Sequence, residues 1–184
     1  MVTIQCQLTG LRPLMFARYA GDNTTQLPTS EQMYLTPERH LILPAINLYS
    51  LLCSENSSVI KMFFGKQGKT IGLGIKSYTT IKPFEIPIQD DAGQITFNGF
   101  NEQIKVHYAT ARVRKGSLYV PQPRERPVLS LPWRIEFMVN YIENKFCTLE
   151  NLRQSFEQGG TLGLGTFRPF FGRYQLTMWK EAHN

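Results

Sequence analysis

The sequence predicts an α+β protein with a ferredoxin-like (RRM-like) β-α-β-β-α-β core, and three observations carry this prediction. A strand pattern followed by a loop and a helix pattern opens the chain, and a strand, helix, loop and strand close it. Of the 184 residues, 42% are hydrophobic, which suffices for one core and is too little for two. No linker composition interrupts the chain, so residues 1–184 are predicted to form a single domain.

In the first third, apolar and polar residues alternate over residues 2–8, which is typical of a half-buried strand. Residues 20–40 are polar and contain glycine and proline, so they predict a long loop. Pro44 suits the first position of a helix, because its missing N–H would be unpaired there. Apolar residues then recur at helical spacing to Cys53, and a second short helix is expected through Phe64.

In the middle third the patterns are weaker, and proline and glycine interrupt them. Strands are predicted at 70–75, 79–88 and 106–113. Asp90-Asp91-Ala92-Gly93 has turn composition, which predicts a protruding hairpin at 83–108. The following stretch, 112–132, is basic and punctuated by prolines.

The C-terminal third has the clearest patterns. Alternation over 134–141 predicts a strand. Thr148 is a suitable N-cap for the helix that follows, and Gly159-Gly160 is expected to end that helix. A glycine- and aromatic-rich loop over 161–173 then leads to a final strand at 174–179.

Composition limits the class of function. The formal net charge is +6 with an isoelectric point near 9.3, which favours phosphate-bearing partners. Three scattered cysteines without C-x-x-C spacing, no export signal and no apolar run of about 20 residues predict a reduced, cytoplasmic protein that is not embedded in a membrane. The three histidines have no metal-ligand spacing, so neither a metal nor a cofactor is expected.

The glycine-rich loop is the most informative segment. Gly163 and Gly165 allow tight turns and close approach to a ligand, and Arg168 and Arg173 can add contacts to phosphate. Phe167 and Phe170 offer rings on which unpaired bases could stack. The alternative is a loop that only packs its aromatic residues on the sheet. Since the loop follows a helix pattern instead of a strand, it is not a dinucleotide-binding fingerprint.

A second group of candidate nucleic-acid-binding residues is basic. It comprises Lys66, Lys69, Arg112, Arg114, Lys115, Arg124 and Arg126. In a strand, Arg112 and Arg114 share a face and would present a charged track to a phosphate backbone. The alternative is a solvated sheet face. Gly65-Lys66-Gln67-Gly68-Lys69-Thr70 lacks the glycine spacing of a phosphate-binding P-loop.

For catalysis the sequence contains one candidate. His40 could act as a general acid or base with Tyr19 or Lys66 assisting, and the alternative is an exposed loop histidine. No nucleophile elbow is present. The balance of these motifs favours a binding protein over an enzyme.

Three short segments resemble the RAMP superfamily of CRISPR-associated RNA-binding proteins, including its small phage-encoded members. They are Gly10-Leu11-Arg12-Pro13-Leu14-Met15, Leu43-Pro44-Ala45, and the ending from Gly163 to Tyr174. The resemblance implies single-stranded RNA lying along the sheet and loops, a hairpin thumb folding over it, and head-to-tail assembly within a bacterial or phage-infected cell. The acid that some members use for RNA cleavage has no counterpart here.

Three functions remain open at this point. The first is a non-catalytic subunit that coats single-stranded nucleic acid, with RNA favoured. The second is a phage single-stranded-DNA-binding or strand-annealing accessory protein, and the third is a metal-independent endoribonuclease that processes guide RNA. A protein-interaction role without nucleic acid is a fourth, broader alternative.

Overall fold

The computed structural model describes residues 1–21, 25–54, 58–115 and 117–182, except the side chains of residues 111–115. Its strands are β1 (Val2–Gly10), β2 (Leu14–Met15), β3 (Ile42–Pro44), β4 (Thr79–Lys82), β5 (Glu85–Asp90), β6 (Gly93–Gln94), β7 (Ile104–Lys115), β8 (Leu118–Leu129), β9 (Arg134–Tyr141) and β10 (Tyr174–Ala182). Its helices are α1 (Ala45–Cys53), α2 (Val59–Phe63), α3 (Gly68–Tyr78) and α4 (Leu149–Leu162), with short 3-10 turns η1 (Thr29–Gln32) and η2 (Gly65–Gln67). No helix among these residues is long and apolar enough to span a membrane.

The main sheet is antiparallel and has the central order β10-β1-β9, with β4 and β5 both pairing with β9. The helices α1 to α3 lie in the connection from β1 to β4, and α4 connects β9 to β10. The α+β class predicted from the sequence is therefore confirmed. The exact ferredoxin-like topology stays a prediction, because the strand beside β9 is split at Pro83-Phe84 and β3 and β6 extend the sheet.

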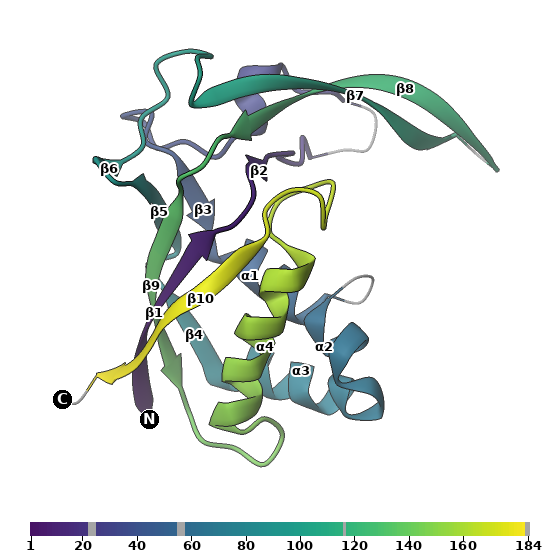
Figure 1. The fold of residues 1–184 in the computed structure, drawn as a ribbon. Helices are drawn as coiled ribbons and strands as arrows, with labels where there is room; N and C mark the ends of the chain where they lie inside the picture. The colour runs from purple at the N-terminus through teal and green to yellow at the C-terminus, as the bar shows by residue number, and fades with distance from the viewer. Residues whose placement is uncertain (22–24, 55–57, 116, 183–184) are drawn as a thin grey trace.

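The helices cover one face of this sheet, as Figure 1 shows. Ile4, Cys6 and Leu8 alternate along β1 and are fully buried, so the predicted half-buried strand is present. Phe156 on α4 packs against Phe137 on β9, with 5.7 Å between the ring centroids. Burying a side chain of this size stabilises the fold by about 1.5–3 kcal/mol, so these contacts hold the helices to the sheet.

A second sheet, in the order β2-β8-β7, is dominated by the long β7–β8 hairpin, which arches away from the main sheet (Figure 1). The hairpin predicted at 83–108 is therefore displaced: 85–94 forms the short β5–β6 pair, and the protruding hairpin spans 104–129.

The prolines of β8 explain why the sequence did not reveal this strand. Pro121, Pro123 and Pro127 occupy alternate positions of β8. The backbone oxygen of Pro127 accepts the amide of Phe16 at 3.0 Å, so the polar groups of that position point away from β7. Because the missing N–H of a proline at these alternate positions would point away from β7, the prolines remove no hydrogen bond from the β7–β8 ladder. They are therefore compatible with a strand.

Two further differences from the sequence prediction have clear physical causes. Residues 70–75, predicted as a strand, belong to α3, because Ile71 and Ile75 lie one helical turn apart and are both buried. α4 continues through Gly159 and Gly160, which were expected to end it. A Cβ at Gly160 would overlap the carbonyl oxygen of Tyr174, so these glycines allow α4 to pack closely on β10.

Candidate nucleic-acid interface

The inner face of the β7–β8 hairpin carries basic residues. His107 pairs with Arg126 and Ala109 pairs with Arg124 in the antiparallel register, so these four side chains share one face. The ring of His107 lies edge-on to Phe171 of the glycine-rich loop, with centroids 5.4 Å apart. This contact shows that the basic face is directed toward the loop, as the arrangement in Figure 1 indicates.

Arg124 and Arg126 are held by amide side chains and by no carboxylate within the described part of the chain. Arg124 donates to Gln26 and, at 3.0 Å, to Gln122. Arg126 donates to Gln32 at 3.0 Å, and its buried Nε has no hydrogen-bond partner. Burial and the neighbouring Arg124 charge lower the pKa of Arg126. A phosphate oxygen at this place would relieve the repulsion and accept the unused N–H groups.

The glycine-rich loop, 163–173, is folded against β2. The Thr166 amide donates to Met15 and the Gly172 amide to Pro13, at 3.1 and 2.8 Å. Gly165 and Gly172 have positive φ angles, and a Cβ on either would overlap a backbone carbonyl oxygen. The glycines therefore serve close packing of the loop. The amides of Leu164, Thr166, Phe170, Phe171 and Gly172 already donate to backbone oxygens, so they are not available to cradle phosphate.

The side chains of the loop differ in their exposure. Phe170 has 73% of its surface exposed, whereas Phe167 is half-buried. Arg168 is half-buried, and burial lowers its pKa. Arg173 has a buried Nε without a hydrogen-bond partner. Arg168 lines cavities on the α1 and α2 sides of the loop, whereas Arg124 lies on the hairpin beside Gln26.

A cavity of about 260 Å³ lies beneath this loop, between β2 and α1. Gly165, Thr166 and Arg168 form its loop side, and Asn47 and Ser50 of α1 form part of the opposite side. Tyr34, which follows η1, also lines it. The cavity is thus continuous with the loop that carries the basic and aromatic candidates.

The other predicted basic residues are placed differently. Lys66 and Lys69 lie at η2 and the start of α3, where Lys69 lines a separate cavity of about 660 Å³. Figure 1 shows these helices at the opposite end of the molecule from the hairpin. The backbone of Arg112, Arg114 and Lys115 belongs to β7, but their side chains lie outside the described residues.

The candidate catalytic residues are not brought together. His40 Nδ1 forms a hydrogen bond of 2.9 Å with Thr96 Oγ1. Tyr19 is 64% exposed, and no hydrogen bond joins it or Lys66 to His40 in the described part of the chain. Among these residues there is also no group of three histidine, cysteine or acidic side chains that could hold a metal ion.

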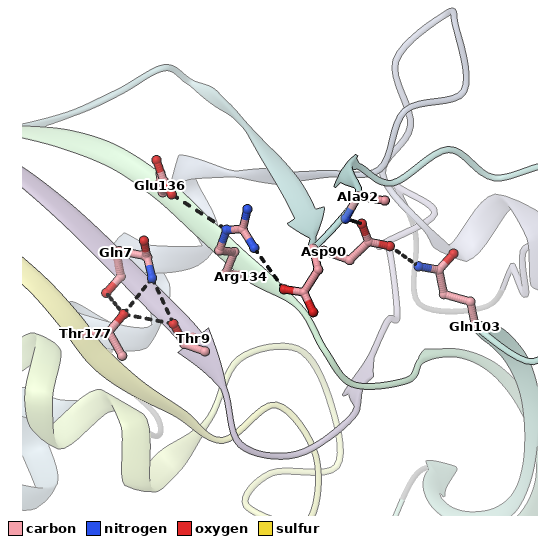
Figure 2. A network of polar contacts seen from close by, with 9 residues as sticks. Gln7, Thr9, Asp90, Ala92, Gln103, Arg134, Glu136 and Thr177 are labelled. Carbon is pink, nitrogen blue, oxygen red and sulfur yellow. Dashed lines mark hydrogen bonds and ion pairs between the residues drawn. The ribbon is translucent and has the colours of Figure 1, made fainter.

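The open face of the main sheet carries polar side chains that bond one another. Gln7 donates to Thr9 and Thr177, and the two threonine hydroxyls are 2.8 Å apart (Figure 2). Arg134 on β9 is paired with Asp91 and Glu136 at 3.5 and 3.7 Å, so its charge is already compensated. The polar groups of Gln7, Thr9, Thr177 and Arg134 on this face therefore bond one another or an acidic side chain, as Figure 2 shows.

Sequence reasoning missed the amide residues of the interface. Gln26 and Gln32 lie in the segment predicted as a long loop, and η1 orders part of it. Gln32 is only 2% exposed, because it also donates to the carbonyl of Leu27 at 3.0 Å. A buried glutamine in a polar loop has no periodic signal, so only the tertiary structure identifies it.

No protein-family model matches the chain, and no curated protein resembles it in sequence. Its fold resembles a chain from the cryo-EM structure of the Type III-B Cmr-beta complex bound to cognate target RNA. The TM-score is 0.59 and the sequence identity is 11%; the match covers 98% of this chain and 60% of that chain. The similarity therefore concerns the fold, and the present chain spans about three fifths of the length of the matched one.

Proposed function

We propose that the protein is a non-catalytic subunit that binds single-stranded RNA and coats it as a head-to-tail oligomer, in the manner of a CRISPR effector backbone subunit. The observation that carries the proposal is the pair Arg124 and Arg126, two guanidinium groups without a carboxylate partner in the described structure, of which Arg126 is partly desolvated. They face a loop with an exposed phenylalanine, in a fold similar to that of a chain from an RNA-bound complex.

Physical chemistry supports a single strand as the ligand. A single strand offers phosphates to guanidinium groups and unpaired bases to aromatic rings at the same time. Phe170 is exposed on the glycine-rich loop, and this loop contacts the arginine-bearing face of the hairpin through Phe171 and His107. The hairpin also exposes Tyr108 and Tyr119, at 72% and 66%, but the register places both on the face opposite to Arg124 and Arg126.

Fluorescence anisotropy of labelled 15-nucleotide RNA and DNA of matched sequence tests the proposal, with titrations at two salt concentrations. We expect salt-dependent binding of RNA, and size-exclusion chromatography of the mixture should show assemblies larger than one protein per strand. Tighter binding of DNA would instead favour the strand-annealing role, since the 2′-hydroxyl distinguishes the two ligands.

The test has two controls. Arg153→Ala removes an arginine that is paired with Glu157 on α4 at 3.0 Å, outside the interface, and should leave binding unchanged. Incubation of a hairpin RNA with the protein and EDTA should leave the RNA intact. Cleavage that is lost in His40→Ala would contradict the non-catalytic assignment, and absence of binding at low salt would refute the proposal.

A further inference from the structure

The cavity beneath the glycine-rich loop has the properties of a pocket for one nucleobase. We propose that it binds a single unstacked purine of the bound strand, with adenine preferred. The protein then recognises one base type at this position and binds the other nucleotides of the strand without base preference. This inference rests on the proposed function and adds base selectivity to it. It does not follow from a coating role, which by itself requires no base preference.

The polar groups of the cavity are unused. In the described part of the chain, the side chains of Asn47, Ser50 and Thr166 form no hydrogen bond, although all three line the cavity. A half-buried amide without a partner, as at Asn47, is costly unless water or a ligand completes its hydrogen bonds. These groups therefore provide donors and acceptors that a ligand can satisfy.

Size and shape restrict the ligand. The volume of about 260 Å³ lies just below the range of about 300–1,000 Å³ that is typical of pockets for drug-sized molecules, so a single planar ring system fits better than a whole nucleotide chain. Tyr34 and Phe16 contribute aromatic surface, and Leu14, Leu43 and Leu51 contribute an apolar base. Such a lining suits the faces of a base, and the polar groups suit its edge.

The cavity adjoins the segment that holds Arg126, one of the proposed phosphate-binding residues. Arg126 donates to Gln32, and Tyr34 follows two residues later, with its carbonyl fixed by the amide of Ile42 at 3.0 Å. On the other side, Arg168 lines both this cavity and a second one of about 500 Å³ between the loop and Met62 of α2. A strand whose phosphates lie along the hairpin arginines could therefore turn one base into the cavity.

The side-chain amide of Asn47, together with the size of the cavity, determines the expected preference for adenine. A carboxamide presents one donor and one acceptor side by side, which matches the donor and acceptor on adjacent positions of adenine. Uracil and cytosine have a single, smaller ring and leave part of the cavity unfilled. We therefore expect adenine to bind more tightly than either pyrimidine.

The experiment compares oligo(rA), oligo(rC) and oligo(rU) of 15 nucleotides by competition against one labelled RNA, for the unmodified protein and for Asn47→Asp and Asn47→Ala. We expect oligo(rA) to bind at least about fivefold more tightly than oligo(rU), the lower limit for discrimination by one bidentate contact. Asn47→Asp keeps the size of the side chain but removes the donor, so it should weaken the preference while the affinity for oligo(rU) stays within about twofold. Asn98→Ala, at an exposed asparagine outside the cavity, is the matched control and should keep the preference.

The outcomes separate this inference from the proposed function. If all three RNAs bind equally and Asn47→Asp changes nothing, the base pocket is refuted and the coating role stands. If none binds, the proposed function fails as well. Thermal unfolding of each variant shows whether a lost preference comes from a lost fold. Asn47→Ala is a second variant that should remain folded, because alanine has a higher helix propensity than asparagine.

Discussion

Arg126→Met separates a binding role of this residue from a structural one. Methionine retains an apolar stem at the base of the hairpin but removes the charge and the hydrogen bond to Gln32. Arg124 and Arg126 lie two residues apart on one face of β8, which places their Cα atoms about 7 Å apart. Two unit charges at about 7 Å repel by about 0.6 kcal/mol in water and by about four times as much at an effective dielectric constant of 20.

The two structural consequences of this substitution nearly cancel. Removing the charge relieves the desolvation and the repulsion from Arg124 that together lower the pKa of Arg126. Losing the hydrogen bond to Gln32 costs about 0.5–1.5 kcal/mol. We therefore expect the free energy of unfolding to change by less than about 1 kcal/mol. RNA affinity, in contrast, should fall about tenfold, which corresponds to ~1.4 kcal/mol.

Two measurements check this prediction. Urea unfolding gives the stability change, and anisotropy titrations from 50 to 200 mM salt give both the affinity and its salt dependence. The logarithmic salt slope should decrease by about 0.7 for each lost phosphate contact on a single strand. Arg153→Met serves as the control on α4. A loss of more than about 2 kcal/mol of stability with an unchanged salt slope would refute the reasoning, because Arg126 would then be structural.

Three further predictions concern the fold that supports the interface. Gly172→Ala, at a φ of 71° and against the carbonyl oxygen of Leu164, should displace the loop and weaken RNA binding, whereas retained affinity would show that the loop conformation is dispensable. Thr148→Ala removes an N-cap that accepts from the Asn151 amide at 3.1 Å and should cost about 1 kcal/mol in chemical unfolding; a change below 0.3 kcal/mol would contradict the importance of this cap. Burial raises the pKa of Cys6 and Cys53 to about 12 and that of Cys147 to about 11, whereas unfolded thiols ionise near 8.5. The stability from their protonated forms is complete below about pH 8.5 and is lost as the pH rises toward those values, so the urea midpoint should fall between pH 8 and pH 10; an unchanged midpoint would argue against buried thiols.

The part of the fold that the sequence predicted correctly is the part with strong local periodicity. The alternation over Val2–Leu8 and the capped helix after Thr148 each carry a complete local signal, and β1 and α4 lie where that signal predicts. Residues 70–75 were wrongly predicted as a strand, because isoleucine and threonine favour strands. The packing of α3 overrides that propensity. Local preference is a weak guide where tertiary burial determines the conformation.

For the candidate interface, the sequence predicted the chemical types of the residues but not their positions in space. Arginines and a glycine-rich loop pointed to a phosphate-bearing ligand. In the structure, the hairpin face that carries Arg124 and Arg126 contacts this loop through His107 and Phe171, whereas Lys66 and Lys69 lie at the opposite end. The long hairpin was predicted about 20 residues too early, because the prolines of β8 look like breaks unless the partner strand is known. Gln32 and Asn47 gave no signal at all.

By itself, the sequence determined the fold class, the positive charge and the order of most elements, since these follow from composition and short-range periodicity. Only the tertiary structure decided which arginines lack a carboxylate partner, which loop amides are already bonded, and that Asn47 and Tyr34 line one cavity. These facts depend on contacts between residues far apart in the chain, and no local pattern specifies the distances across which charges, amides and rings meet.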